Sequence, residues 1–158
     1  MTWSAANTWA TTLVYGGVSG WRLPTTLQPD LSCNFQSGGD SYDYNCTGSE
    51  MGHLYYTELG NPAGGPLTNT APFSNVQPNY YWSGTEYAAV PGFAWFFLFY
   101  EGYQDVTDGT TFEFYAWAVH SGDVGPAAVP EPGTALLLGS GLVGLVGIGL
   151  RRAKRRRG

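Results

Sequence analysis

The sequence predicts an α+β domain followed by one C-terminal helix that is apolar enough to cross a membrane. Two helical patterns come first and several short strand patterns come later, an order that favours an α+β layer arrangement. All 25 aromatic residues lie in residues 1–130, and such a content favours a packed core over disorder. Residues 1–130 hold one base and eleven acids, whereas residues 131–158 hold six bases and one acid. We therefore expect the two parts to occupy different environments.

The first predicted element is a helix from Thr2 to Tyr15. Thr2 or Ser4 can cap its start, and Gly16-Gly17 ends it. An extended stretch of residues 20–25 follows, because a proline disfavours helix in the residue before it. Apolar residues at i, i+3 and i+4 spacing indicate the buried face of the helix. These residues are Trp3, Ala6, Trp9, Ala10 and Leu13.

A second helix is predicted from about Gly48 to Leu59. Thr47 and Glu50 have the spacing of a capping box, in which each side chain bonds the backbone N–H of the other residue. Gly60-Asn61-Pro62 ends this helix, and residues 61–79 form a loop rich in Gly, Pro and Asn.

Four short strands are predicted after this loop. Residues 80–83 form the first, and residues 94–100 form a strongly apolar second. The third, residues 103–106, is reached through Glu101-Gly102 as a tight hairpin. The aromatic and aliphatic run of residues 112–120 fits a half-buried fourth strand.

Residues 133–150 are predicted to form a single transmembrane helix. These 18 uncharged residues would span about 27 Å as a helix, close to a hydrocarbon core of roughly 30 Å. A buried core helix is the alternative, but six glycines make a poor helix in water and are better tolerated in lipid. By the positive-inside rule the tail of residues 151–158 stays cytoplasmic and residues 1–130 lie outside. The basic residues of this tail are Arg151, Arg152, Lys154, Arg155, Arg156 and Arg157.

A proline-flanked acid precedes the apolar span, within a linker of residues 125–132. The four residues are Val129, Pro130, Glu131 and Pro132. Followed by the span and the basic tail, they resemble a PEP-CTERM sorting signal. The resemblance implies recognition by an exosortase, a membrane protease-transpeptidase of Gram-negative bacteria that make exopolysaccharide and biofilm. It also implies residence in the inner membrane before processing, and then at the cell surface or in the extracellular matrix.

Four spaced motifs in residues 2–123 resemble the Lcl C-terminal-like domains, a bacterial family named for a collagen-like adhesin. The motifs are Trp21-Arg22-Leu23-Pro24-Thr25, Tyr81-Trp82-Ser83-Gly84-Thr85-Glu86, Ala94-Trp95-Phe96-Phe97 and Tyr115-Ala116-Trp117-Ala118-Val119. We assign residues 1–124 to such a domain. The resemblance implies a C-type-lectin-like fold with two helices and an antiparallel sheet, and, in the best-known relative, adhesion to sulfated glycans.

Cys33 and Cys46 are the two cysteines of the chain, and they close a 14-residue loop in the part predicted to lie outside the cell. A reactive thiol or a metal pair is the alternative, but two cysteines without a histidine cluster do not form a zinc site. An oxidising compartment favours a disulfide, worth about 3 kcal/mol for a loop of this size. Asn45-Cys46-Thr47 also fits a glycosylation sequon, but the bacterial sorting tail removes the usual reason to invoke one.

We expect no catalytic site and no enzymatic activity. A catalytic triad needs a histidine, a nucleophile and a carboxylate that converge, and the positions of His53 and His120 do not indicate one. No Gly-x-Ser-x-Gly motif is present either. The rival hypothesis is an enzyme related to formylglycine-generating enzymes, which share the Arg-Leu-Pro-Thr motif. That chemistry needs a reactive cysteine late in the chain, and none follows Cys46.

Acidic loop residues make calcium the one cofactor left open; otherwise we expect no cofactor and no metal site. Asp40 and Asp43 lie in the cysteine loop, and Glu101, Asp105 and Asp108 lie around the predicted hairpin. Calcium prefers six to eight oxygen ligands, often from loop carboxylates and carbonyls. A solvated acidic surface is the simpler interpretation of the same residues.

Aromatic side chains are the other candidate surface, because sugars stack on their faces. The sequence does not tell which of Tyr42, Tyr44, Tyr87 or Tyr103 reach solvent, so it names no sugar site. Gln28-Pro29-Asp30 matches a sugar-specificity tripeptide of C-type lectins. It precedes the second helix instead of lying in a late long loop, so we interpret the match as a coincidence.

These patterns favour an exported, non-enzymatic binding or structural module of the extracellular matrix, with carbohydrate binding and adhesion in a biofilm as the preferred activity. A purely structural matrix protein is the alternative. The expected partners are an exosortase, the membrane before processing and an extracellular polysaccharide; we expect no nucleic acid.

The sequence also predicts that a natural N-terminal segment is missing. Met1-Thr2-Trp3 opens directly into a helix, without the basic and apolar regions of a secretion signal. Relatives in the resembling family carry an export signal and a first strand, which commonly pairs with the last strand in C-type-lectin-like folds. Without that partner, residues 112–119 would keep an open aromatic edge that invites intermolecular pairing.

Overall fold

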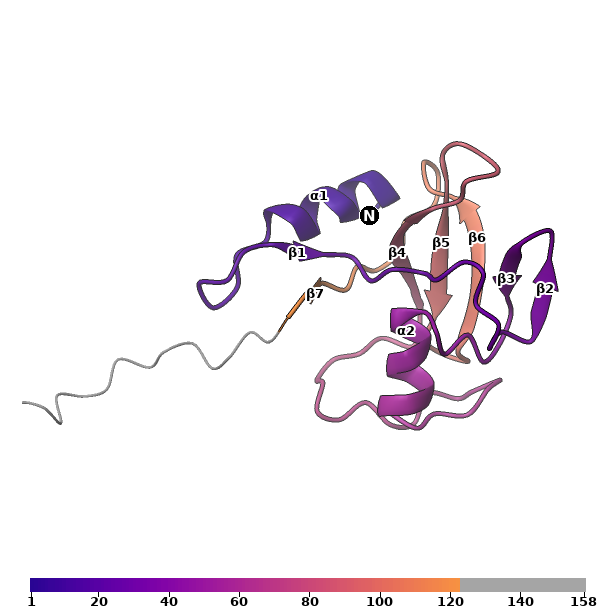
Figure 1. Ribbon diagram of the computed structural model, residues 1–158. Helices are drawn as coiled ribbons and strands as arrows, with labels where there is room; N and C mark the ends of the chain where they lie inside the picture. The colour runs from indigo at the N-terminus through magenta and orange to yellow at the C-terminus, as the bar shows by residue number, and fades with distance from the viewer. Residues whose placement is uncertain (123–158) are drawn as a thin grey trace, which may run out of the picture. The chain divides into compact units, whose positions relative to one another are not determined.

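A three-stranded antiparallel sheet is the centre of residues 1–122, the part of the chain that the computed structural model describes (Figure 1). Its strands are β4 (Tyr80–Glu86), β5 (Phe93–Leu98) and β6 (Tyr103–Asp108), in that spatial order. Aromatic residues dominate β4 and β5, and such residues suit a pleated, buried surface. The predicted linker, transmembrane helix and basic tail (125–158) lie outside the described residues. Within residues 1–122, no helix has the length and apolar character that a membrane span requires.

The two faces of the sheet bury two hydrophobic clusters, because side chains alternate between faces along a strand. Trp82 and Phe96 belong to the first cluster, and their neighbours Tyr81 and Phe97 belong to the second. The other buried members are Ala6, Ala10, Leu23 and Ala94 in the first cluster, and Met51, Tyr55, Leu59 and Phe99 in the second. One helix therefore contributes to the covering of each face.

Helix α1 (Trp3–Thr12) supplies the two buried alanines of the first cluster. It is shorter than the predicted helix, because Leu13 already has an extended backbone. Thr2 occupies the N-cap position but makes no side-chain cap bond. Trp9, which the sequence pattern placed on the buried face, is 37% exposed.

The predicted second helix is present as α2 (Glu50–Gly52), which continues as the π-helical turn η1 (His53–Glu58). The predicted capping box with Thr47 is wrong, because the Glu50 carboxylate bonds Arg22 instead. A free guanidinium is a stronger partner for a carboxylate than a neutral backbone N–H.

The cysteine loop contains a hairpin of β2 (Phe35–Ser37) and β3 (Asp40–Tyr42), where the sequence predicted only a loop. Asp43 and Gln104 exchange two backbone hydrogen bonds of 2.9 and 3.0 Å, which attach this hairpin to β6. The hairpin is a separate two-stranded sheet that is thus attached to β6, an edge strand of the central sheet.

The predicted fourth strand is mostly irregular. Only its end forms β7 (Val119–His120), which pairs antiparallel with β1 (Trp21–Arg22). Phe114 exchanges two backbone hydrogen bonds with Met1, and Tyr115 makes two with β4. The expectation of an open edge along residues 112–119 is therefore wrong at Phe114, Tyr115 and β7, whose backbone groups have partners.

The β5–β6 connection also differs from the predicted two-residue turn. Leu98 pairs with Tyr103, so the loop contains four residues, 99–102. Phe99 leaves the sheet because its ring is fully buried in the second cluster. Gly102 closes the loop with a φ of +82°, a conformation that glycine adopts without steric cost.

Candidate functional site

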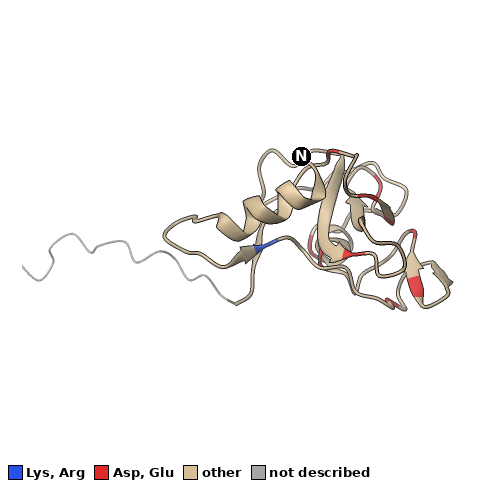
Figure 2. Cartoon of the chain, turned by 90° about the horizontal axis from the view of Figure 1, so that it is seen from above, with Lys and Arg blue, Asp and Glu red and all other residues tan. Residues whose placement is uncertain are grey.

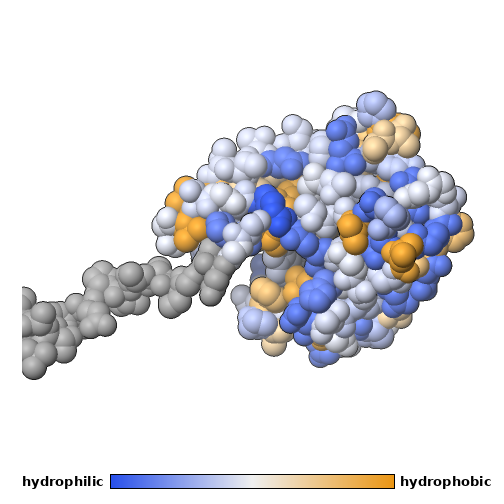
Figure 3. All heavy atoms as spheres, viewed as in Figure 1, coloured by the Kyte–Doolittle hydropathy of each residue, from blue (hydrophilic) through white to orange (hydrophobic). Residues whose placement is uncertain are grey.

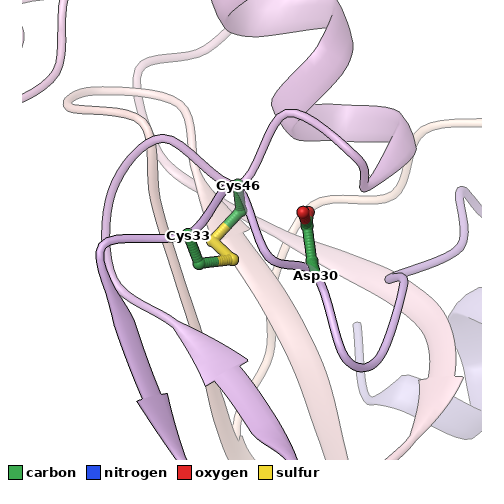
Figure 4. Close-up of side chains that lie close together, drawn as sticks. All are labelled: Asp30, Cys33 and Cys46. Atoms are coloured by element: carbon green, nitrogen blue, oxygen red, sulfur yellow. A yellow bond between two sulfur atoms is a disulfide. The ribbon is translucent and has the colours of Figure 1, made fainter.

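Cys33 and Cys46 form a disulfide, as the loop length and predicted compartment indicated. Both residues are buried, and Asp30 lies beside them (Figure 4). In residues 1–122 this is the only set of three potential metal ligands that lie close together. Because both sulfur atoms are in the disulfide, they provide no thiolate ligands.

The buried carboxylate of Asp30 has a structural role. Its Oδ2 accepts hydrogen bonds from the backbone N–H groups of Gly48 and Ser49, at 2.9 and 3.0 Å, just before α2. The side chain of Gln28 makes two hydrogen bonds with the backbone of Ser41 in β3. Both polar residues of the Gln-Pro-Asp tripeptide are thus used internally, which agrees with the interpretation of that match as a coincidence.

The acidic loop residues considered for calcium do not converge on one point in the described part of the chain. Asp40 accepts a hydrogen bond from the Tyr87 hydroxyl at 3.0 Å, and Asp105 accepts one from Tyr103 at 2.8 Å. The hydrogen bond to Asp40 raises the pKa of Tyr87. The pKa of Tyr103 is raised mainly by burial and in addition by the hydrogen bond to Asp105. The acidic residues are thus distributed over several separate segments of the chain, as Figure 2 shows.

Arg22 is the only Lys or Arg in residues 1–122, and it appears as the single blue segment of Figure 2. Its guanidinium forms a bidentate ion pair with Glu50, with N–O distances of 2.6 and 2.7 Å. Hydrogen bonding to Arg22 lowers the pKa of Glu50 to about 2, with further bonds from Thr25 adding to the effect. The ion pair fixes β1 to the start of α2.

A first cavity, of about 540 Å³, lies between the loop of residues 72–77 and the segment 115–118. Tyr81 also lines it, and its hydroxyl oxygen accepts a hydrogen bond from the backbone N–H of Gln77 at 2.9 Å. The Gln77 side chain bonds the Asn75 amide oxygen at 2.7 Å. Burial raises the pKa of Tyr81, so its hydroxyl remains protonated at neutral pH.

A second cavity, of about 360 Å³, lies against α2 and η1. His53 and Glu58 line it and are in hydrogen-bond contact, with an Nε2–Oε1 distance of 3.1 Å. An α-helix would not bring residues five apart together. The π-helical turn does, because Leu59 bonds the carbonyl five residues earlier in the chain. The other lining residues are Pro24, Glu50, Met51, Leu54, Phe73, Trp117, Ala118, Val119 and His120.

The two cavities adjoin, because Phe73, Trp117 and Ala118 line both. The rings of Phe73 and Trp117 meet edge to face, with centroids 5.1 Å apart. We call the two cavities together the aromatic groove, lined by residues 72–77 and 115–120 and by α2 and η1. Their volumes fall in the range of small-molecule binding sites.

The aromatic residues of the groove are partly exposed and also pack against neighbouring rings. Phe73 and Tyr115 are 38% and 46% exposed. Trp117 is half-buried, and it stacks on Phe99 with a centroid distance of 5.6 Å and an angle of 12° between the planes. Tyr115 packs against Tyr81 at 5.4 Å. Rigid rings beside amide and hydroxyl groups suit a ligand that has both apolar faces and hydroxyls.

The sequence placed Tyr115 and Trp117 in a family motif, but it did not name them, or Phe73, as site residues. The four tyrosines that it considered are all half-buried and do not line the aromatic groove. His53, which no sequence pattern associated with a site, is exposed and lines the groove with His120. Phe73 and Trp117 are 44 residues apart in the sequence, so only the tertiary structure brings them together.

The predicted sorting residues Val129–Pro132 and the basic tail lie outside the described residues, but comparison with known families covers them. A model of the PEP-CTERM protein-sorting motif matches residues 128–156. This signal implies membrane anchoring, exosortase processing and export to the cell surface of a Gram-negative bacterium.

A model of the Lcl C-terminal domain matches residues 1–120. No curated protein and no solved structure matches the chain significantly. Since the Lcl match covers most of the sequence, the chain belongs to the Lcl C-terminal domain family, and it carries a PEP-CTERM protein-sorting motif at its C-terminal end.

Proposed function

We propose that this protein is a non-enzymatic carbohydrate-binding module, which its sorting signal presents at the cell surface or in the extracellular matrix of a biofilm. The observation that carries the proposal is the aromatic groove. Trp117 and Phe73 meet at its centre, and Tyr115 exposes its ring along the same wall. Sugar rings have apolar C–H faces that pack on aromatic side chains, and hydroxyls that need hydrogen-bond partners.

Polar groups for such hydroxyls line the first cavity. The loop of residues 72–77 contributes Ser74, Asn75 and Gln77, and Tyr81 contributes its hydroxyl. The face of the protein in Figure 3 is largely polar, with separate apolar patches. A hydrated ligand such as a glycan fits a cavity lined by amide and hydroxyl groups better than an extended apolar partner would.

The proposal also includes a C-type-lectin-like fold and a membrane-spanning C-terminal segment. A C-type-lectin-like fold is supported by two helices on a central antiparallel sheet and by the pairing of an early strand, β1, with the last strand, β7. We propose that residues 133–150 span the inner membrane before processing, with residues 151–158 in the cytoplasm.

A binding role is favoured over catalysis by the state of the cysteines. The formylglycine-type chemistry of the rival hypothesis needs a reactive thiol, but both cysteines of the chain form the disulfide. A purely structural matrix protein is the remaining alternative; it would have the same sorting signal but no glycan ligand.

A glycan array probed with the full chain in detergent, with and without calcium, tests the proposal. We expect binding to at least one neutral or amine-bearing glycan class. Phe73→Ala and Tyr115→Ala should each weaken it about tenfold, because truncating a central aromatic contact costs on the order of 1–2 kcal/mol.

Phe35→Ala and Tyr100→Ala are the matched controls. Phe35 and Tyr100 are 47% and 49% exposed, outside the aromatic groove, and Phe35 packs against one ring, Tyr42, as Phe73 packs against Trp117. Both controls should bind as the wild type does. Absence of any glycan binding by the folded chain would favour the structural alternative, and an equal loss in the control variants would exclude the aromatic groove as the site.

A further inference from the structure

One end of the aromatic groove is acidic. Glu50 and Glu58 both line the second cavity, together with His53 and His120. The first cavity, by contrast, is lined by uncharged residues only. The groove therefore has a neutral part and a part with carboxylates, joined at the Phe73–Trp117 pair.

The two carboxylates differ in what they already bind. Glu50 is fully engaged by Arg22 and Thr25, with four hydrogen bonds of 2.6 to 3.0 Å. Glu58 pairs only with His53 among the described residues, and its side chain is 62% exposed. Glu58 is thus the carboxylate of the groove that is available to a charged ligand.

No Lys or Arg in residues 1–122 neutralises the charge of Glu58. Residues 1–122 hold ten acids and one base, a formal charge of −9, and the one base is Arg22, which pairs with Glu50. Such a field repels polyanions and attracts cations toward the protein. An ammonium in the second cavity would also lie near Trp117, and aromatic faces attract cations.

We propose that the aromatic groove binds an amine-bearing glycan, a polymer of hexosamines with free amino groups, and that Glu58 pairs with an ammonium of that ligand. The inference rests on the proposed carbohydrate-binding function and names its ligand class. The aromatic pair holds the sugar rings, and the amides of the first cavity bond their hydroxyls. The carboxylate end distinguishes free amines from acetylated ones and from sulfated sugars.

The test compares two oligosaccharides on the full chain in detergent at about pH 6, below neutrality, so that a sugar amine, a weaker base than a lysine, is largely protonated. One is a pentamer of glucosamine and the other a pentamer of N-acetylglucosamine, which differ only in acetylation. We expect the glucosamine pentamer to bind about tenfold more tightly, which corresponds to ~1.4 kcal/mol. This preference should shrink as salt is added, because screening weakens an exposed ion pair.

Glu58→Gln should abolish the preference and leave the affinity for the acetylated pentamer within about twofold, because only the ammonium contact is lost. Glu86→Gln is the matched control. This variant makes the same change of charge at the last residue of β4, which is exposed and lies outside the groove. It should keep the preference for the glucosamine pentamer. Phe73→Ala should weaken both pentamers alike.

The possible failures are distinguishable. Equal affinity for the two pentamers, or equal loss of the preference in Glu86→Gln, would overturn the assignment of an amine-bearing ligand while the proposed function stands. Binding of a sulfated glycan in preference to both pentamers would do the same. A folded chain that binds no glycan on the array would overturn the proposed function itself.

Discussion

Glu50 joins three parts of the chain through one carboxylate. It begins α2, receives two hydrogen bonds from Arg22 in β1, and receives two more from Thr25 beyond β1. These bonds hold its pKa at about 2, below the ordinary value of 4.5. Because the folded pKa is lower than the unfolded one, the pair stabilises the fold above about pH 4.5. That contribution is lost as the pH falls toward 2.

We predict that Glu50→Gln lowers the free energy of unfolding by about 1–2 kcal/mol at neutral pH. The value is discounted because the Glu50 side chain is 38% exposed and solvent screens the pair. Urea unfolding of the wild type and the variant from pH 7 to pH 2 measures the effect, and the two should approach each other between about pH 4.5 and pH 2. Glu113→Gln, at an exposed residue, is the control. A difference that persists unchanged at pH 2 would contradict the prediction.

At the scale of elements, the disulfide holds the segment before α2 in place. It closes the loop that contains the β2–β3 hairpin, and Gly52 of α2 packs so closely on the Cys46 carbonyl that any Cβ there would overlap it. The disulfide therefore stabilises a loop, a hairpin and the start of the helix that lines the aromatic groove.

Replacing both cysteines by alanine should lower the free energy of unfolding by about 3 kcal/mol, the loop-closure value for a ring of this size. Urea unfolding of the double variant under oxidising conditions measures the loss, and the wild type with added reductant should approach the variant. Peptide mapping of exported protein without reduction checks the bond itself. Two free thiols in that protein would refute the pairing and weaken the case for export.

The whole chain combines an acidic, aromatic domain with a basic, apolar sorting segment. The Lcl family match ends at residue 120 and the sorting motif begins at residue 128. Between the sorting residues and the domain the sequence is short, and Glu131 lies between Pro130 and Pro132; a proline in general favours an extended conformation of the residue before it. A membrane protease could reach such a stretch.

We predict that the mature protein is cleaved near Pro130-Glu131-Pro132, which would release the domain from its predicted span. Intact-mass analysis of protein from the native host should show the loss of all residues after the cleavage position. Replacing Glu131 by alanine should leave the precursor uncut, with the C-terminal segment attached. Mature wild-type protein that retains residues 151–158 would show that the prediction is wrong.

Local sequence patterns alone predicted several features of this protein. The order of helices and strands, the disulfide and the sorting motif depend on periodicity, cysteine count and spacing within short segments, and all of these can be counted along the chain. The predicted ends of the helices and strands were less accurate, because they depend on which side chains are buried in the folded protein. Phe99 lies outside β5 because its side chain is buried in the second cluster. The segment of residues 112–118 bonds to Met1 and β4 and does not form a regular strand.

Only the tertiary structure decided where the groove lies. Phe73 in a long loop and Trp117 near the last strand share no local pattern, and their contact depends on how two irregular segments pack on Tyr81 and Phe99. The contact between His53 and Glu58 depends on a π-helical turn, where an α-helical period would place the two side chains on different faces. Long-range packing and local departures from ideal helix geometry are not encoded in residue spacing. The sequence alone therefore placed Trp117 in a family motif but did not assign Trp117 or Phe73 to a binding site.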